Sequence, residues 1–229
     1  MGSCVGEEFQ PWERFGRWIH CICVVTFDLE LGQALEVVYP GDAQLSSTEK
    51  TNICYLAFPD SNSGCTRDTT FHFRIRRSAT HVSDAHVLYC ERAPLAIGID
   101  PLYYYGFAHF RQQKDATLPR GYYQKSLILI TLLPLFNLYS LIIDTIATAF
   151  FQSGEPAVEA ACHHIDQWPA PIPGEPLNLP LLGHIIECRI PCKADIELPN
   201  RLSSVDFKRR SDQPNCVALS SVHEPDLCL

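Results

Sequence analysis

The feature that most constrains the fold is an almost unbroken apolar stretch over residues 126–151. Its length would suffice for a membrane-spanning helix. Pro134 divides the stretch where a strand would give way to a helix, and Asp144 would cost about 3 kcal/mol in lipid. The polar residues of the second half recur every three or four positions, at Asn137, Ser140, Asp144 and Thr148. We therefore expect a strand followed by a buried helix with one exposed edge, and no transmembrane segment.

The polar and apolar residues of the predicted helix lie on opposite faces. The four polar residues form one stripe, and Leu135, Leu138, Ile142, Ile146 and Ala149 lie opposite it. Replacement of Asp144 by Leu should then be tolerated, because exposed substitutions usually change stability by no more than about 0.5 kcal/mol.

Apolar residues at two-residue spacing or in short runs predict five strands that precede this helix. The fifth of them is the first half of the apolar stretch. The expected strands cover residues 18–26, 34–39, 71–76, 103–111 and 124–133. A capping box at Ser46–Glu49 begins a helix that should end near Ala57. Glu155 and Pro156 begin another helix, with proline in the first turn. The expected order is strand, strand, helix, three strands, and then helices, which is an α/β (α+β) fold.

Proline marks a change of organisation after this region. Five prolines within residues 169–180 predict a polyproline-type linker between domains. Residues 181–191 alternate again and predict the first strand of a second, incomplete module. We expect residues 15–168 to form the main domain, residues 1–14 to be disordered, and residues 192–229 to be a disordered or alternative tail.

Composition excludes several classes of function. The net charge of −8 argues against a nucleic-acid binder. The 11 cysteines contain no CxxC pair, and they are interpreted as free, mostly buried thiols in a reducing, cytoplasmic setting. His163 and His164 are adjacent on a helix, so their rings diverge and do not predict a metal site. No phosphate-binding loop, nucleophile elbow or metalloprotease motif is present, so we expect no catalytic residue, metal or cofactor.

Four long blocks resemble the DENN family. They read FGRWIHCICVVTFDLELGQALEVVYP from Phe15, TFHFRIRR from Thr70, YYYGFAHFRQQKDATLPRGYYQKSLILIT from Tyr103, and LPLLGHIIECRIP from Leu179. The nearest resemblance is to the DENN domain-containing protein 6 group, and the AVL9 group is next. The resemblance covers about residues 12–191 and implies an upstream DENN module, a longin-like fold with a five-stranded, antiparallel-rich sheet and flanking helices.

The resemblance also implies a function. Full-length members are guanine-nucleotide exchange factors for Rab GTPases and regulate vesicle traffic at recycling endosomes, so a Rab GTPase is the expected protein partner. Peripheral association with endosomal membrane follows from the same resemblance. The family's central and downstream modules do not follow residue 191, which implies that this chain supplies one lobe only and leaves exchange by it alone uncertain. A longin-type adaptor and a competitor that binds a Rab without exchange are the alternatives.

Candidate binding residues come from charge and position. The expected partner-binding residues are basic and lie on strands and loops: Arg74, Arg76, Arg111, Lys114 and Arg120. A solvated charged edge explains each of them equally well. At the amino terminus, Gly2 could accept myristate and Cys4 palmitate, although position six is Gly rather than Ser or Thr and two glutamates follow.

Overall fold

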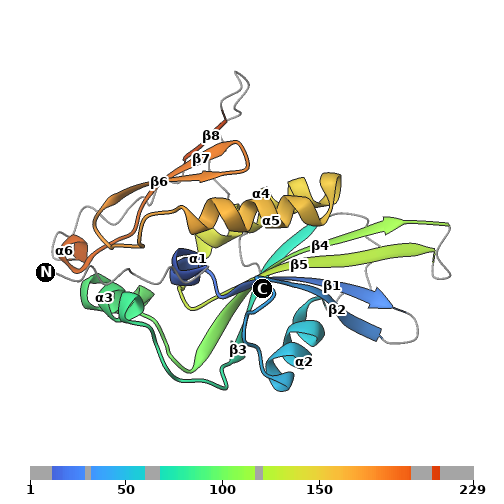
Figure 1. Cartoon of the computed structure of the whole chain (residues 1–229), viewed down its shortest axis with the longest axis horizontal. Helices are drawn as coiled ribbons and strands as arrows, with labels where there is room; N and C mark the ends of the chain where they lie inside the picture. Colours follow the sequence, from blue (N-terminus) through green and yellow to red (C-terminus); the bar gives the residue numbers. More distant parts are fainter. Residues whose placement is uncertain (1–11, 29–31, 60–67, 117–120, 197–207, 212–229) are drawn as a thin grey trace, which may run out of the picture.

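The computed structural model describes residues 12–28, 32–59, 68–116, 121–196 and 208–211. It is an α/β structure in which a five-stranded antiparallel sheet is flanked by helices, as expected for a longin-like fold (Figure 1). The large sheet consists of β1 (Cys21–Asp28), β2 (Gly32–Tyr39), β3 (Thr69–Arg76), β4 (Tyr103–Lys114) and β5 (Tyr122–Thr131). The helices are α1 (Glu13–Trp18), α2 (Ser47–Leu56), α3 (Asp84–Arg92), α4 (Phe136–Ser153), α5 (Glu155–Asp166) and α6 (Lys193–Ile196). A smaller sheet contains β6 (Pro176–Leu181), β7 (His184–Arg189) and β8 (Lys208–Ser211).

The strand order of the large sheet is β2-β1-β5-β4-β3. The most apolar strands, β1 and β5, lie inside the sheet and are buried on both faces, which explains why their sequences read as nearly continuous apolar runs. Helices α4 and α5 cover one face of the sheet, and α2 covers the other (Figure 1). Successive residues of each strand therefore supply two separate hydrophobic clusters.

The long apolar stretch forms the end of β5 and most of α4, which confirms the predicted division at Pro134. Leu138, Ile142 and Ile146 are buried against the sheet, while Asn137 and Thr148 are exposed. The stripe prediction is therefore confirmed at its two ends, whereas Ser140, Asp144 and Ala149 are each half-buried. Among the described residues, no helix has the length and apolar character needed to cross a membrane.

The predicted capping box is confirmed at the start of α2. Ser46 Oγ accepts a hydrogen bond from the Glu49 backbone N–H at 3.2 Å, and Glu49 Oε2 accepts from the Ser46 N–H at 2.7 Å. The other oxygen of Glu49, Oε1, accepts from the Ser78 N–H at 2.8 Å, so the same carboxylate fastens the segment after β3. Burial acts to raise the pKa of Glu49, but these amide hydrogen bonds outweigh it and lower the pKa.

Several elements of the structure depart from the sequence prediction. It adds α1 before β1, and it adds α3 and a short 3-10 turn, Leu95–Ile97, between β3 and β4. Helix α3 was missed because it exposes Val87 and Leu88 and buries His86, the reverse of an amphipathic pattern. Residues 176–180 of the predicted linker belong to strand β6 instead. Its prolines are accommodated because β6 is an edge strand, where a missing N–H costs no hydrogen bond.

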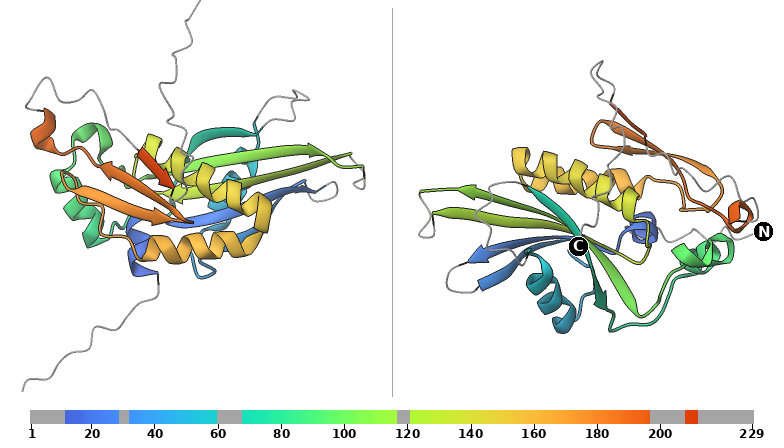
Figure 2. Two further views of the ribbon diagram at one scale, coloured as in Figure 1. Left: turned by 90° about the horizontal axis from the view of Figure 1, so that it is seen from above. Right: turned by 180° about the vertical axis from the view of Figure 1, so that it is seen from behind.

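The smaller sheet packs on the helices of the large one (Figures 1 and 2). Leu179 and Ile186 are fully buried in the same cluster as Trp18 and Trp168. The Trp168 indole N–H donates to the Pro180 carbonyl oxygen at 2.7 Å. The predicted strand after the prolines is present as β7; its membership of a second module stays a prediction. Most of the predicted tail lies outside the described residues, apart from 192–196 and 208–211.

Candidate protein-interaction site

Two basic residues of the edge strand β3 lie exposed on the face of the sheet that carries α4. Thr70, His72, Arg74 and Arg76 share this face because strand residues alternate, and Phe71, Phe73 and Ile75 face α2. Two residues of α4 contact this face of β3, since Asp144 accepts a hydrogen bond from Thr70 and Phe136 packs on His72. Arg74 and Arg76 lie farther along the strand, and all four residues of the face remain exposed. We call the group made of the exposed His72, Arg74, Arg76 and Phe136 and the half-buried Tyr103 and Tyr105 the β3 edge patch.

Aromatic rings support this patch. The Arg74 guanidinium lies 3.9 Å from the centre of the Tyr103 ring. The Phe136 ring packs edge-on against His72 at 4.9 Å and against Tyr105 at 5.6 Å between ring centres, and 39% of Phe136 remains exposed. Within the described part of the chain, Arg74 and Arg76 form no ion pair. Arginine and aromatic residues together are typical of protein–protein hot spots, and an unpaired guanidinium is free to bind a carboxylate.

Arg111, a third predicted residue, is already engaged. Its guanidinium binds both oxygens of Asp68, at 2.5 and 2.8 Å, and stacks on the Phe151 ring at 4.0 Å. The bidentate contact raises the pKa of Arg111, and the same Arg111 hydrogen bonds hold the pKa of Asp68 below its usual value. Arg111 therefore fixes the residue before β3 to β4 and α4, which is a structural role.

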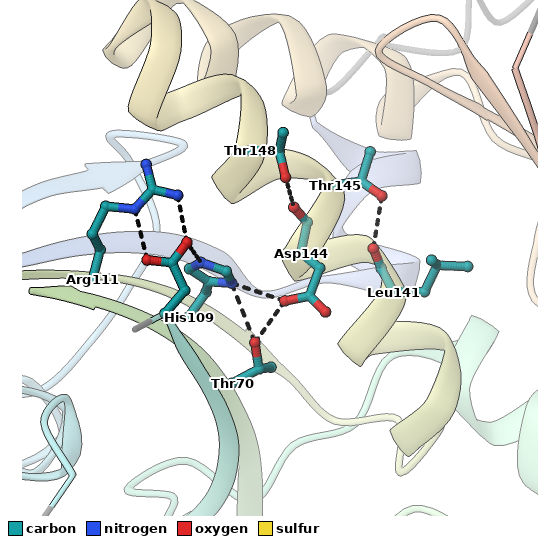
Figure 3. Close-up of polar contacts among 8 residues, drawn as sticks. Thr70, His109, Arg111, Leu141, Asp144, Thr145 and Thr148 are labelled. Carbon is teal, nitrogen blue, oxygen red and sulfur yellow. Dashed lines mark hydrogen bonds and ion pairs between the residues drawn. The ribbon is translucent and has the colours of Figure 1, made fainter. Parts of the chain in front are cut away.

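A buried histidine continues this polar network toward α4 (Figure 3). His109 Nδ1 lies 2.8 Å from Asp144 Oδ1, and the Thr70 hydroxyl donates to the same oxygen at 2.6 Å. Because a carboxylate only accepts hydrogen bonds, His109 carries its proton on Nδ1. His109 Nε2 lies 3.4 Å from Asp68 Oδ2, too poorly aligned for a hydrogen bond. Asp144 thus links the stripe of α4 to strands β3 and β4.

Lys114 lies at the far end of β4 from the β3 edge patch. It is exposed and lines a cleft of about 440 Å³ together with Arg111, Lys125, Tyr123 and Phe151. The cleft's other cations are paired, since Lys125 Nζ binds Glu36 at 2.7 Å and Arg111 binds Asp68. Among the described residues that line this cleft, Lys114 is therefore the cation that forms no ion pair, and the structure does not bring it together with Arg74 and Arg76.

Three further predicted residues, Arg120, Gly2 and Cys4, lie outside the described residues. Tyr103, Tyr105 and Phe136 were not proposed from the sequence. The run of tyrosines after residue 102 predicts strand β4. It does not predict which of these rings remain accessible, because that depends on where α4 packs on the sheet. Asp144 and His109 can be identified from the sequence as polar residues within apolar segments, but no local pattern indicates that they contact each other.

The cysteines of the described part of the chain form no disulfide bonds. The seven cysteines found there are free, and four of them are buried. Cys21 and Cys23 lie on one face of β1, as predicted, with their sulfur atoms 3.7 Å apart. No group of three or more potential metal ligands occurs among the described residues.

Known proteins resemble the chain over most of its length. The family described as "Transport protein Avl9" matches residues 19–158. The chain is 49% identical over 222 residues to Protein DENND6B of Homo sapiens, which covers 95% of this chain and 37% of that protein. It is 47% identical over 219 residues to Protein DENND6A of Mus musculus, covering 94% and 36%, respectively. A Protein DENND6 homolog of Dictyostelium discoideum is 31% identical over 175 residues, covering 76% and 22%.

The chain spans little more than a third of the length of the two mammalian relatives. The family match covers more than half of this chain, and its residues include the whole large sheet and α4. The chain therefore belongs to the Avl9 family and, within it, to the DENN domain-containing protein 6 group.

Proposed function

We propose that the chain is the upstream lobe of a DENN-type guanine-nucleotide exchange factor and binds a Rab GTPase in endosomal membrane traffic. Membership of the DENN domain-containing protein 6 group supports this function. The single structural observation that carries it is the β3 edge patch, because a chain of net charge −8 leaves two arginines there without acidic partners among the described residues.

Exchange requires no covalent step. A GTPase holds its nucleotide with switch loops that the phosphates and Mg²⁺ keep ordered. A protein that binds the nucleotide-free form more tightly than the loaded form lowers the affinity for nucleotide by the same ratio, whereas equal binding to both forms changes nothing. In this proposal the lobe supplies one of the binding surfaces, and the remainder of a full-length relative supplies the others.

The test measures binding and nucleotide release separately. Purified chain is titrated against a panel of Rab GTPases in the nucleotide-free, GDP-bound and GTP-bound forms, and release of a fluorescent GDP analogue is followed with and without the chain. Preferential binding to one nucleotide-free Rab with faster release supports an exchange factor. Binding without faster release supports the adaptor or competitor alternative, and no binding to any Rab refutes the proposal.

Charge reversal locates the surface. Arg74→Glu and Arg76→Glu should each weaken Rab binding about fivefold, because an exposed ion pair contributes up to about 1 kcal/mol and reversal adds repulsion. Lys114→Glu tests the other end of β4. Arg14→Glu is the matched control, since Arg14 is exposed on α1, which packs on α5. A loss with Lys114→Glu alone would move the binding surface to the cleft.

We further propose that the protein acts in the cytoplasm and on the surface of recycling endosomes. Acylation at Gly2 and Cys4 would supply a membrane anchor of its own, because two acyl chains give stable binding where one is marginal. Fluorescence microscopy of the tagged chain with endosomal markers tests the location, and a diffuse signal that Gly2→Ala does not change would contradict it.

A further inference from the structure

Strand β3 is a regular edge strand of the large sheet. It pairs with β4 through eight consecutive residues without a shift of register. At the opposite edge, the pairing of β1 with β2 is interrupted by an irregularity between Val24 and Val25. Edge strands that are long and regular present a row of backbone N–H and C=O groups to which another strand can pair, and bulges are one of the devices that prevent this. Figure 2 shows β3, in teal, on the outer side of β4.

One hydrogen bond identifies which residues present these groups. The Arg77 N–H donates to the Leu102 carbonyl at 2.8 Å, and this pair continues the register in which Arg76 lies opposite Tyr103. Hydrogen-bonded pairs alternate along an antiparallel ladder, so Ile75, Phe73 and Phe71 bond to β4. The backbone groups that point outward therefore belong to the four intervening residues, Thr70, His72, Arg74 and Arg76.

The same alternation on β4 gives an independent check. The Asp115 N–H donates to the Gly121 carbonyl at 2.9 Å, which places the odd-numbered residues of β4 in the hydrogen-bonded phase with β5. The even-numbered residues of β4 then bond to β3, in agreement with the assignment from Arg77.

Side-chain chemistry specifies what could pair with this edge. Residues directly opposite one another on neighbouring strands place their side chains on the same face. A strand added to β3 would therefore place alternate side chains beside Arg74 and Arg76, where carboxylates would meet unpaired guanidinium groups. The intervening side chains would lie beside Phe71, Phe73 and Ile75, where apolar side chains fit.

We propose that the outer edge of β3 binds an extended acidic segment of a partner protein by strand addition. The segment carries two carboxylates two residues apart, facing Arg74 and Arg76, with apolar residues between and beside them. Backbone hydrogen bonds to the outward groups supply affinity, and the alternating carboxylates supply specificity. This binding mode does not depend on whether the chain binds a GTPase, and it applies to any partner that presents such a segment.

The probe is the peptide acetyl-TVEVEITS-amide, added to the full chain labelled with ¹⁵N. Hydrogen exchange measured by NMR in the free chain should be fast at His72, Arg74 and Arg76 and slow at Phe73 and Ile75. At about ninety per cent saturation with peptide, exchange of the three fast amides should slow about tenfold, because only a tenth of the molecules stay free. Unchanged exchange at these amides up to millimolar peptide would overturn the proposal.

Two peptide variants and one protein pair separate strand addition from simple charge attraction. A peptide with both glutamates replaced by glutamine, and the double variant Arg74→Glu, Arg76→Glu, should each weaken binding about tenfold, while Arg14→Glu should change it by less than about twofold. A peptide N-methylated on the amides that face β3 keeps its charge and should not bind measurably. Equal affinity of the N-methylated peptide would show that the arginines only protect a charged edge, and the proposal would be wrong.

Discussion

Asp144 on α4 offers the sharpest test of how the helix is held on the sheet. Its carboxylate accepts hydrogen bonds from His109 Nδ1 at 2.8 Å and from the Thr70 hydroxyl at 2.6 Å. The Asp144 side chain is 46% exposed, whereas the His109 side chain is only 9% exposed. Asp144→Ala thus removes the carboxylate that accepts from the buried His109 N–H and leaves that N–H the longer contact to the Thr70 hydroxyl oxygen, 3.2 Å from Nδ1.

The magnitude follows from these two exposures. Hydrogen bonds to a charged group contribute about 1.5–3 kcal/mol, and the contact to His109 is the one that water replaces poorly. We expect Asp144→Ala to lower the free energy of unfolding by about 2 kcal/mol, which corresponds to about 4–8 °C in Tm for a chain of this size. Asp144→Asn keeps an acceptor oxygen and should lose about half as much.

Urea unfolding followed by circular dichroism measures this loss. Thr148→Ala is the matched control, since Thr148 lies one turn away on the same stripe and its hydroxyl donates to the Asp144 backbone carbonyl, at 2.7 Å, and to no strand among the described residues. The control should lose no more than about 0.5 kcal/mol. If Asp144→Ala and Thr148→Ala lose the same amount, the network is not what holds α4, and the reasoning fails.

Three further outcomes are expected. Gly106→Ala should destabilise the fold by about 1–3 kcal/mol in the same assay, because an added Cβ would lie 2.3 Å from the Phe73 ring; unchanged stability would show that this ring moves aside freely. Since the pKa of Glu49 is lower in the folded than in the unfolded chain, its contribution is complete above the ordinary value of 4.5 and is lost as the pH falls through the folded pKa. The stability difference between the wild type and Glu49→Gln should thus narrow in acid, and a constant difference from pH 7 to 3 would contradict the assignment. Metabolic labelling with a myristate analogue should mark the wild type and not Gly2→Ala, and label on neither would end the lipidation hypothesis.

The elements predicted correctly from the sequence are those in which the spacing of apolar residues matches the residues that the fold buries. The central strands and α4 are long and apolar, so their composition alone indicates that they are buried. The capping box predicted the start of α2 because it needs only four neighbouring residues. Helix α3 and strand β6 were missed because α3 buries a histidine and β6 contains prolines, which local rules count against helix and strand.

Prediction of the site was limited in the same physical way. Alternation along β3 correctly indicated that Arg74 and Arg76 share an exposed face. The engagement of Arg111 by Asp68 joins residues 43 positions apart, and no local signal specifies it. Asp144 was correctly placed on the polar stripe, yet the expected tolerance to leucine does not follow, because partial exposure leaves room for the contacts to His109 and Thr70.

The packing of β6 and β7 onto the helices has a practical consequence for anyone who wishes to shorten this chain. Trp18 and Trp168 meet edge to face at 5.4 Å between ring centres, and the strand after the prolines completes the wall around them. An expression fragment that stops before residue 176 would expose Trp168 and the apolar residues of the same cluster to water. We expect such a fragment to aggregate during purification. Fragments for crystallisation therefore need to extend at least through Ile190, the last residue of this cluster that is buried within the described part of the chain.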